Sequence, residues 1–269
     1  MAIHDTAKIH PAALVEEGAV VGAHCEIGPF AVVGPEVVLG DNCILKSHAV
    51  VVGWTTIGEK TTIYPFASVG HAPQDLKFAG ERTKLEIGSQ NTIREGVTLN
   101  PGTLGGGNLT KIGNNNLLMG NAHVGHDCIL GDNIVVANGV GLGGHVIIED
   151  NVILGGHSGI HQFCRIGTGA MLAGFAAVTK DVIPFGMVHG NHADLTGLNL
   201  VGLKRRGYEK SDINSLRAAY KDVFNQDTDT LQNRLIQALA DYPTSGLVAQ
   251  IVAFAQLDTS RGICTPKER

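Results

Sequence analysis

Residues 18–40, GAVVGAHCEIGPFAVVGPEVVLG, contain the pattern that decides the fold: an aliphatic residue recurs every six positions. Val21, Ile27, Val33 and Leu39 are the aliphatic members in this stretch, and a glycine follows each of them. A period of six fits neither an α-helix nor a long amphipathic strand, but it fits a short strand and a corner that alternate. We expect glycine to suit these corners because it tolerates unusual backbone angles.

The same six-residue series runs through most of the chain. It is unbroken from Ile9 to Val69, returns in phase from Ile87 to Leu99, and resumes one residue out of step from Ile112 to Val178. This pattern resembles the hexapeptide repeat of left-handed parallel β-helices, in which three hexads make one triangular coil of about 18 residues. The resemblance implies an all-β, left-handed parallel β-helix, shaped as a triangular prism, over residues 1–190.

Four of the five cysteines lie two positions before an aliphatic member of the series, at a second site that mostly holds small side chains. We interpret Cys25, Cys43, Cys128 and Cys164 as small core residues rather than as catalytic or metal-binding groups. Cys25 and Cys43 are one coil apart, but an odd number of cysteines without a secretory signal argues against a disulfide.

Two segments break the repeat, and both should leave the prism as loops. They are residues 70–86, GHAPQDLKFAGERTKLE, and residues 100–111, NPGTLGGGNLTK. Loops on a rigid scaffold are where binding groups concentrate, so we expect both to contribute to function.

The repeat ends near Pro184, and residues 191–269 are expected to form a small α-helical domain. Apolar residues at helical spacing follow Ser211, which is a plausible N-cap. The expected helices cover residues 211–224, 229–242 and 247–257.

Composition limits the classes of partner. The formal net charge is −5, so nothing indicates nucleic acid or an anionic membrane as a general partner. The N-terminal sequence lacks a basic start with an apolar region after it, and no apolar stretch approaches the roughly 20 residues of a membrane span. We therefore expect a cytoplasmic protein that does not span a membrane.

Three histidines have a spacing that fits the coil. His126 and His145 are 19 residues apart, and His126 and His161 are 35 apart, so each separation is within one residue of whole coils. We expect the three to lie on one side of the prism, outside the core. An imidazole there could take a proton from an alcohol near pH 7.

Several longer motifs make a more specific resemblance, and they occur in order along nearly the whole chain. They are QDLKFAGE (74–81), NAHVGHDC (121–128), GGHV (143–146), HQFCRIG (161–167) and GNHADLTGLNLVGLKRRG (190–207). These motifs resemble those of the UDP-N-acetylglucosamine acyltransferases. The family moves a 3-hydroxyacyl chain from acyl carrier protein to the 3-position of UDP-N-acetylglucosamine, the first step of lipid A synthesis, and uses no cofactor.

The resemblance implies a role for each matching residue. His126 is the general base, Asp127 orients it, and the backbone N–H of Gly144 faces the thioester oxygen, with no metal ion in the site. The family is a homotrimer and binds the acyl chain in a groove between subunits. Residues near the end of this groove set the length of chain that fits, and the matching positions here are Met171 and Gly174. The substrate-binding positions that the family implies are Asp75, Lys77, His123, His145, His161, Gln162, Asn199, Arg205 and Arg206.

Two positions depart from the family pattern. Asn100 is at a position where the family usually has histidine. Asparagine can form hydrogen bonds, but unlike histidine it cannot take up and release a proton. Val201 replaces a glutamate thought to help hold the nucleotide. These departures leave open an acceptor sugar whose C3 carries an amine instead of a hydroxyl, and His126 could serve either as base.

Other functions remain possible at this point. A γ-type carbonic anhydrase is also a left-handed β-helix trimer, and His126, His157 and His161 could converge on zinc. A related N-acyltransferase of the same pathway shares the repeat but normally adds an N-terminal uridine-binding domain, whereas here the hexads begin at Ile9. A purely structural β-helix would have no need for the loop motifs.

Overall fold

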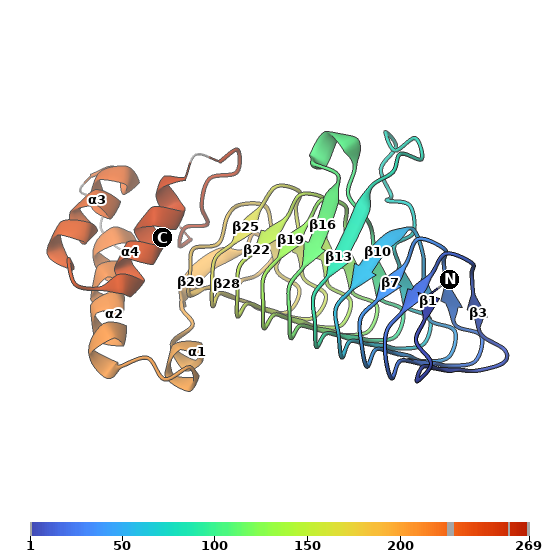
Figure 1. Ribbon diagram of the computed structural model, residues 1–269. Coiled ribbons are helices and arrows are strands. Elements are labelled where there is room, and N and C mark those ends of the chain that lie inside the picture. Colours follow the sequence, from blue (N-terminus) through green and yellow to red (C-terminus); the bar gives the residue numbers. More distant parts are fainter. Residues whose placement is uncertain (1, 225–228, 258, 268–269) are drawn as a thin grey trace.

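Each hexad forms a short strand and a corner, and three successive hexads make one coil of a triangular prism (Figure 1). The computed structural model describes residues 2–224, 229–257 and 259–267. Strands of successive coils pair in parallel, so that residue Ala2 lies beside Val20 and Ile3 beside Val21. The parallel β-helix expected from the repeat is therefore confirmed.

Three sheets form the faces of the prism. The first sheet contains β1 (Ala2–Ile3), β4 (Val20–Val21), β7 (Val38–Leu39), β10 (Trp54–Ile57), β13 (Lys84–Ile87), β16 (Leu109–Ile112), β19 (Ile129–Leu130), β22 (Ile147–Ile148) and β25 (Arg165–Ile166). The second contains β2 (Lys8–Ile9), β5 (Glu26–Ile27), β8 (Ile44–Leu45), β11 (Thr62–Ile63), β14 (Thr92–Ile93), β17 (Leu117–Leu118), β20 (Val135–Val136), β23 (Ile153–Leu154), β26 (Met171–Leu172), β28 (Gly186–His189) and β29 (Asp194–Leu198). The third contains β3 (Leu14–Val15), β6 (Val32–Val33), β9 (Val50–Val51), β12 (Ser68–Val69), β15 (Thr98–Leu99), β18 (His123–Val124), β21 (Gly141–Leu142), β24 (Gly159–Ile160) and β27 (Ala177–Val178).

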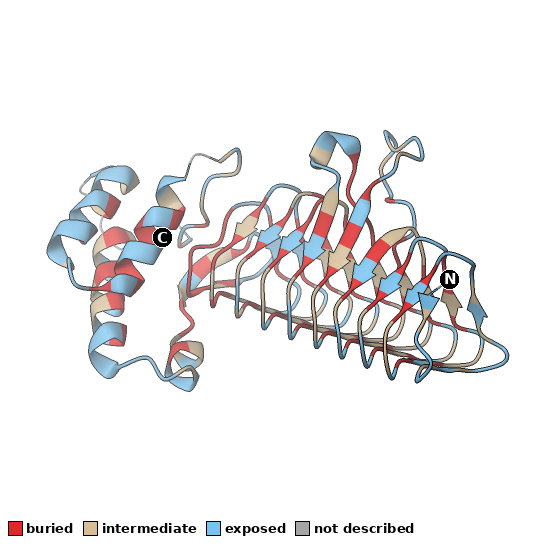
Figure 2. Cartoon of the chain, in the orientation of Figure 1, coloured by how far each residue is buried: buried red, intermediate tan, exposed pale blue. Residues whose placement is uncertain are grey.

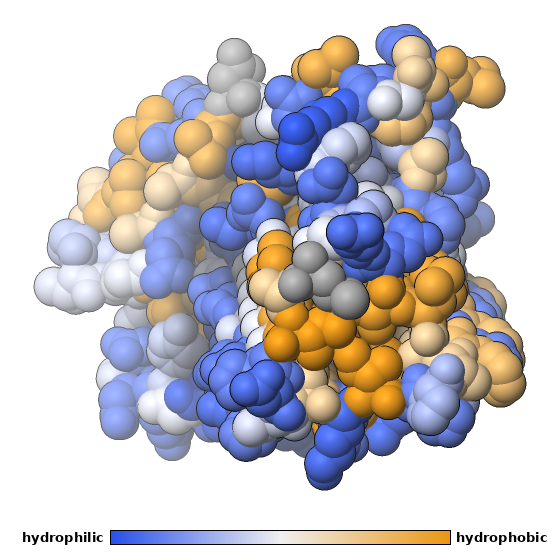
Figure 3. Space-filling view, turned by 45° about the vertical axis from the view of Figure 1, so that its right-hand side comes forward, coloured by the Kyte–Doolittle hydropathy of each residue, from blue (hydrophilic) through white to orange (hydrophobic). Residues whose placement is uncertain are grey.

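The core is the inside of the prism: in the two-residue strands from β4 to β27 the second residue is buried, and buried residues are red in Figure 2. Ile63, Leu99 and Leu118 are completely buried there, and the small-residue site two positions earlier is buried as well. Ile9 and Val15 are only partly buried, because the first coil has a neighbouring coil on one side alone. Apolar side chains gather at this N-terminal end, which comes forward in Figure 3.

The cysteines follow the prediction. Cys25, Cys43, Cys128 and Cys164 are all buried and free. The Cys25 thiol donates to the carbonyl of Gly40 at 3.1 Å, in keeping with a small core residue.

The corner glycines have a different purpose from the one expected. The residue in the left-handed region is two positions further on, for example His24 with a φ of 56° and Asn42 with a φ of 59°. A Cβ on Gly22 would lie 2.7 Å from the carbonyl carbon of Gly40 on the next coil. Glycine is therefore needed for the close approach of stacked coils, and the prediction that it supplies unusual backbone angles there is wrong.

The two loops explain the phase of the repeat. Thr55 pairs with Leu85, 30 residues away instead of the usual 18, so the first loop adds 12 residues, a whole number of hexads. Leu85 pairs with Thr110, 25 residues away, so the second adds 7, one more than a hexad. Strands β13 and β16 begin inside the ranges predicted as loops, which shortens the loops to residues 70–83 and 100–108.

The change from strands to helices occurs at Asn199 rather than at residue 190, because β29 pairs antiparallel with β28 and extends the second sheet. Helix α2 begins at Lys210, so Ser211 is inside it and the N-cap prediction is wrong. The helices are α1 (Leu200–Arg205), α2 (Lys210–Phe224), α3 (Leu231–Asp241) and α4 (Gly246–Gln256).

The helical domain is joined to the last coil by a buried ion pair. The Arg165 Nε donates to the Asp181 carboxylate at 2.9 Å, and its Nη2 donates to the carbonyl of Phe254 in α4 at 3.0 Å. Asp181 is completely buried, and a buried pair of this kind ties two elements together because losing one partner leaves an uncompensated charge.

Candidate active site

One corner of the prism, where the chain passes from the third sheet to the first, carries most of the predicted groups. The loop of residues 70–83 leaves it after β12, and the loop of residues 100–108 leaves it after β15. On the next two coils the same corner follows β18 and β21 and presents His126, Asp127 and His145. Stacking in steps of one coil therefore gathers residues far apart in the sequence.

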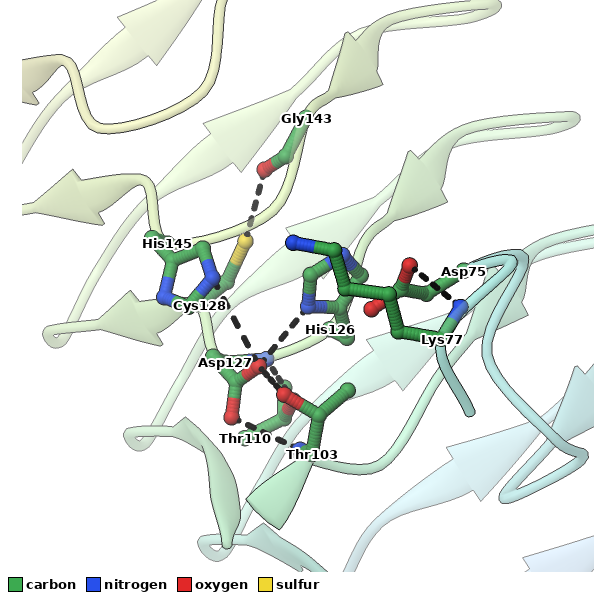
Figure 4. A network of polar contacts seen from close by, with 9 residues as sticks. All are labelled: Asp75, Lys77, Thr103, Thr110, His126, Asp127, Cys128, Gly143 and His145. Atoms are coloured by element: carbon green, nitrogen blue, oxygen red, sulfur yellow. Dashed lines mark hydrogen bonds and ion pairs between the residues drawn. The ribbon is translucent and has the colours of Figure 1, made fainter. Parts of the chain in front are cut away.

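His126 and Asp127 form a hydrogen-bonded pair at this corner (Figure 4). Nδ1 of His126 is 2.7 Å from Oδ2 of Asp127, whose side chain has no exposed surface. The carboxylate also accepts from the backbone N–H of Thr103 at 2.8 Å and from its hydroxyl at 2.7 Å. Asp127 has a φ of 58°, and its own N–H donates to the hydroxyl of Thr110. The arrangement holds the imidazole in one orientation with Nδ1 engaged.

Gly144, one coil further on, lies over the ring of His126. A Cβ there would be 2.5 Å from Cε1, 2.6 Å from Nε2 and 3.0 Å from Nδ1 of His126, so a larger residue would displace the ring. The predicted base and the predicted oxyanion donor are therefore in contact, and the role of the Gly144 N–H stays a prediction.

His145 extends the cluster on the next coil. Its Nε2 is 3.8 Å from Oδ2 of Asp127, and its ring meets that of His126 edge to face. Burial lowers the pKa of His145, an effect that the Asp127 carboxylate opposes. Phe163 stacks on the outer face of the His145 ring, with centroids 4.4 Å apart. Sequence reasoning missed Phe163, although it lies in the motif HQFCRIG and follows His145 by one coil.

His123 faces outward from β18 beside this cluster. Its Nδ1 is 2.7 Å from the hydroxyl of Thr98 on the preceding coil. Burial lowers the pKa of His123, and the nearby His126 lowers it further. The next outward positions along the sheet are Gly141 and Gly159, which have no side chain, and then Ala177.

The first loop comes close to the cluster. Asp75 and Lys77 lie beside His126 in Figure 4, and the Lys77 N–H donates to the Asp75 carboxylate at 3.1 Å. The base of this loop is held by Asn100, whose amide donates to the carbonyls of His71 at 3.1 Å and Ala72 at 3.4 Å. Asn100 thus has a definite contact in place of the family histidine.

Comparisons with known proteins show the family to which the chain belongs. The model described as "Udp N-acetylglucosamine O-acyltransferase; Domain 2" matches residues 181–264, and the model of the bacterial transferase hexapeptide matches residues 18–53 and 109–144. The acyl carrier protein-dependent UDP-N-acetylglucosamine O-acyltransferase of Paracoccus denitrificans (strain Pd 1222) is 49% identical over 204 residues, 76% of this chain and 77% of that protein. The chain belongs to the UDP-N-acetylglucosamine acyltransferase family.

Solved structures of this family share the fold along the whole chain. The family member from Campylobacter jejuni is 38% identical with a TM-score of 0.91 and covers 97% of this chain and 100% of that one. The one from Acinetobacter baumannii is 43% identical with a TM-score of 0.83, over 98% and 100% of the two chains. The expected left-handed β-helix and membership of the family are thereby confirmed.

Other residues implied by the family lie further along the prism, His161 and Gln162 at the same corner and Met171 and Gly174 away from it. His161 and Gln162 are exposed one coil beyond Gly143 and Gly144. Met171 belongs to β26 in the second sheet, and Gly174 is at the corner between the second and third sheets. The structure does not bring Met171 and Gly174 next to His126 within one chain.

The positions around α1 have contacts of their own. Asn199 is buried as the N-cap of α1, where its side-chain oxygen accepts from Gly202 and its amide donates to the carbonyl of Gly169. Arg206 donates to the carbonyl of Asn151 at 2.7 Å, at the corner between the first and second sheets, and burial lowers its pKa. Arg205 is exposed and Val201 is 59% exposed.

The zinc-site alternative does not match the cluster seen within one chain. His157 is at the corner between the second and third sheets, stacked on Phe175, whereas His126 is at a different corner. Among the described residues, the group with metal-ligand proximity is His126, Asp127 and His145, and two of these are already paired by hydrogen bonding. In the described part of the chain, no helix is long and apolar enough to cross a membrane.

Proposed function

We propose that this protein transfers an (R)-3-hydroxyacyl chain from acyl carrier protein to the 3-hydroxyl of UDP-N-acetylglucosamine, the first step of lipid A synthesis. The observation that carries the proposal is the His126–Asp127 pair, with Gly144 of the next coil in contact with the same ring. The relatives are named as O-acyltransferases, which favours a hydroxyl over an amine acceptor.

The chemistry follows from this arrangement. Nε2 of His126 takes the proton of the sugar 3-hydroxyl while the oxygen attacks the thioester carbon, and Asp127 stabilises the imidazolium that forms. Negative charge on the thioester oxygen is met by the Gly144 backbone N–H. Collapse breaks the C–S bond, and His126 returns the proton to the leaving thiolate. No covalent acyl-enzyme is formed.

The proposed substrate-binding groups lie around this pair. Asp75, Lys77, His123, His145, His161 and Gln162 surround it on one side of the prism, where carboxylate, amide and imidazole groups can bind sugar hydroxyls and Lys77 can reach the donor. Arg205, exposed at the end of α1, can bind a nucleotide phosphate with two parallel hydrogen bonds.

We further propose a homotrimer with sites between subunits. His126, Gly174 and Arg206 are at three different corners of one prism, so residues of these groups can act together only across subunits. Leu76 and Leu104, at the tips of the two loops, are 106% and 65% exposed, as expected of side chains that a partner covers. A groove between prisms would also exclude water from the thioester, and Met171 and Gly174 would border its acyl end.

The test is acyl transfer by wild type and His126→Asn, with 3-hydroxyacyl carrier proteins of graded length and UDP-N-acetylglucosamine. We expect a loss of about 10² or more in kcat/KM for His126→Asn. His24→Asn is the matched control, because His24 is an exposed corner residue where later coils have asparagine, for example Asn42. Wild type without activity towards this sugar, or an active His126→Asn, would reject the proposal; sedimentation of a fully active monomer would reject the shared groove.

A further inference from the structure

The carboxylate of Asp127 has more polar contacts than the orientation of one imidazole needs. Oδ2 lies 2.7 Å from Nδ1 of His126 and also accepts from the Thr103 hydroxyl at 2.7 Å. Oδ1 accepts from the Thr103 backbone N–H at 2.8 Å. Thr103 is itself 6% exposed, so these hydrogen bonds lie away from water. Hydrogen bonds to a charged group are strongest in such surroundings.

Thr103 belongs to the second loop, and the loop is folded to present it. The Thr103 carbonyl accepts from the N–H of Gly106 at 3.1 Å and of Asn108 at 2.9 Å, which closes the loop on itself. Thr110, in β16 directly after the loop, accepts from the Asp127 N–H through its hydroxyl at 2.7 Å. Asp127 is therefore held by a residue of the loop and by a residue of the strand that follows it.

The middle of the loop covers the carboxylate. Gly106 packs so closely on Asp127 that a side chain at position 106 would overlap the carboxylate group. Leu104, two residues before Gly106, is exposed. The sequence predicted a functional role for this loop, and its contacts with Asp127 suggest what that role is.

We propose that Thr103 is a positioning residue for the His126–Asp127 pair, and that the loop of residues 100–108 is the cover that keeps this pair dry and correctly oriented. The inference rests on the proposed function, since it assumes that His126 acts as a base. It assigns Thr103 no contact with substrate.

The expected effect on pH dependence follows from charge sharing. The Thr103 hydroxyl donates a hydrogen bond to the Asp127 carboxylate and so delocalises part of its negative charge. That part of the charge would otherwise stabilise a protonated His126. Removing the hydroxyl concentrates that charge on His126, which favours the protonated ring, so the acid limb of the kcat/KM profile moves to higher pH. The other groups that face His126 are His145, His123, Asp75 and Lys77, and these are unchanged by the substitution.

The experiment compares Thr103→Val with Thr103→Ser. The valine variant keeps shape and the backbone N–H contact but loses the hydroxyl; we expect kcat to fall about tenfold, the loss of one hydrogen bond to a charged group. The acid limb should move up by a few tenths of a pH unit or more. Serine should restore both. Thr61→Val is the matched control, because Thr61 is completely buried and its hydroxyl donates to the carbonyl of Gly88, away from this corner.

The outcomes separate this inference from the proposed function. If His126→Asn is inactive but Thr103→Val keeps the wild-type kcat and pH profile, the positioning role is rejected and the base survives. If serine is as impaired as valine, or if Thr61→Val shifts the profile equally, Thr103 acts through packing and the inference is rejected. If His126→Asn is active, the proposed function itself fails.

Discussion

The ring of His126 lies directly over Gly144 of the next coil, so that a Cβ on Gly144 would be 2.6 Å from Nε2. Gly144→Ala must therefore displace the imidazole or the backbone. We expect kcat to fall by about 10² while the fold is kept, because a small misplacement of a catalytic group has a cost of this order. Gly246→Ala is the control, since a side chain there meets open space. Steady-state kinetics checks this, and a normal kcat in Gly144→Ala would contradict it.

Asp127→Asn should lower kcat strongly and change KM little. An asparagine keeps the shape but carries no charge to stabilise the imidazolium, and its amide can present an N–H to Nδ1 instead of an acceptor. We expect a loss of about 10² to 10⁴ in kcat, as in other catalytic His–Asp pairs. A measurement of kcat from pH 6 to 9 checks the prediction; a variant with a wild-type rate would show that Asp127 is structural.

We expect His123 to make the folded state less stable in acid. Burial lowers the pKa of His123 below its unfolded value, so the unfolded chain binds the proton more tightly and stability is lost as pH falls below about 6.5. His123→Gln removes this titration and can keep the contact with Thr98. We therefore expect the difference in Tm between pH 8 and pH 5 to shrink in the variant. An unchanged difference would contradict the prediction.

Asn100 should control the first loop. Its amide donates to the carbonyls of His71 and Ala72, and its Oδ1 is buried without a partner among the described residues. In Asn100→Asp both donors are lost and a negative charge faces two carbonyl oxygens. We expect faster proteolysis within residues 70–83 and a KM raised about tenfold, the effect of about two neutral hydrogen bonds. Equal proteolysis of variant and wild type would contradict this.

The core positions of the hexads should dominate stability. Leu118 is completely buried, and Leu118→Ala should cost about 2–5 kcal/mol, since a closely packed coil cannot collapse into the cavity. Leu14 occupies the outward position of its strand and is 53% exposed, so Leu14→Ala is a matched control with a much smaller expected effect. Thermal unfolding of both variants checks the contrast, and equal losses would contradict the inward assignment.

Much of the fold could be predicted because it is local and repeated. A hexad needs one inward aliphatic residue, and Ile63, Leu99 and Leu118 meet that need wherever they occur along the chain. The same periodicity located both loops but not their ends, because strands β13 and β16 extend by pairing with neighbouring coils. The reason given for Gly22 was wrong. Glycine is required there because the next coil is so close, and its own backbone angles do not require it.

The site could be predicted less completely. The spacing of His126 and His145 predicted that the two lie on one side of the prism, as the structure shows, and the family motifs supplied Asp127 and Gly144 as candidates. Thr103 carries no sequence signal of this kind, because it is in a segment outside the repeat and 24 residues before the carboxylate that it holds. Phe163 was hidden by its position at an ordinary corner, and only stacking on His145 shows its contact.

The sequence by itself determined the parallel β-helix, its inward residues, the two interruptions and the family, since each depends on a pattern or motif that is contiguous along the chain. Only the tertiary structure decided which groups meet: that the second loop covers Asp127, that Asn199 caps a helix, and that Arg206 binds the backbone at Asn151. The physical reason is that residues on successive coils lie within hydrogen-bonding distance, although an insertion between them changes how far apart they are in sequence.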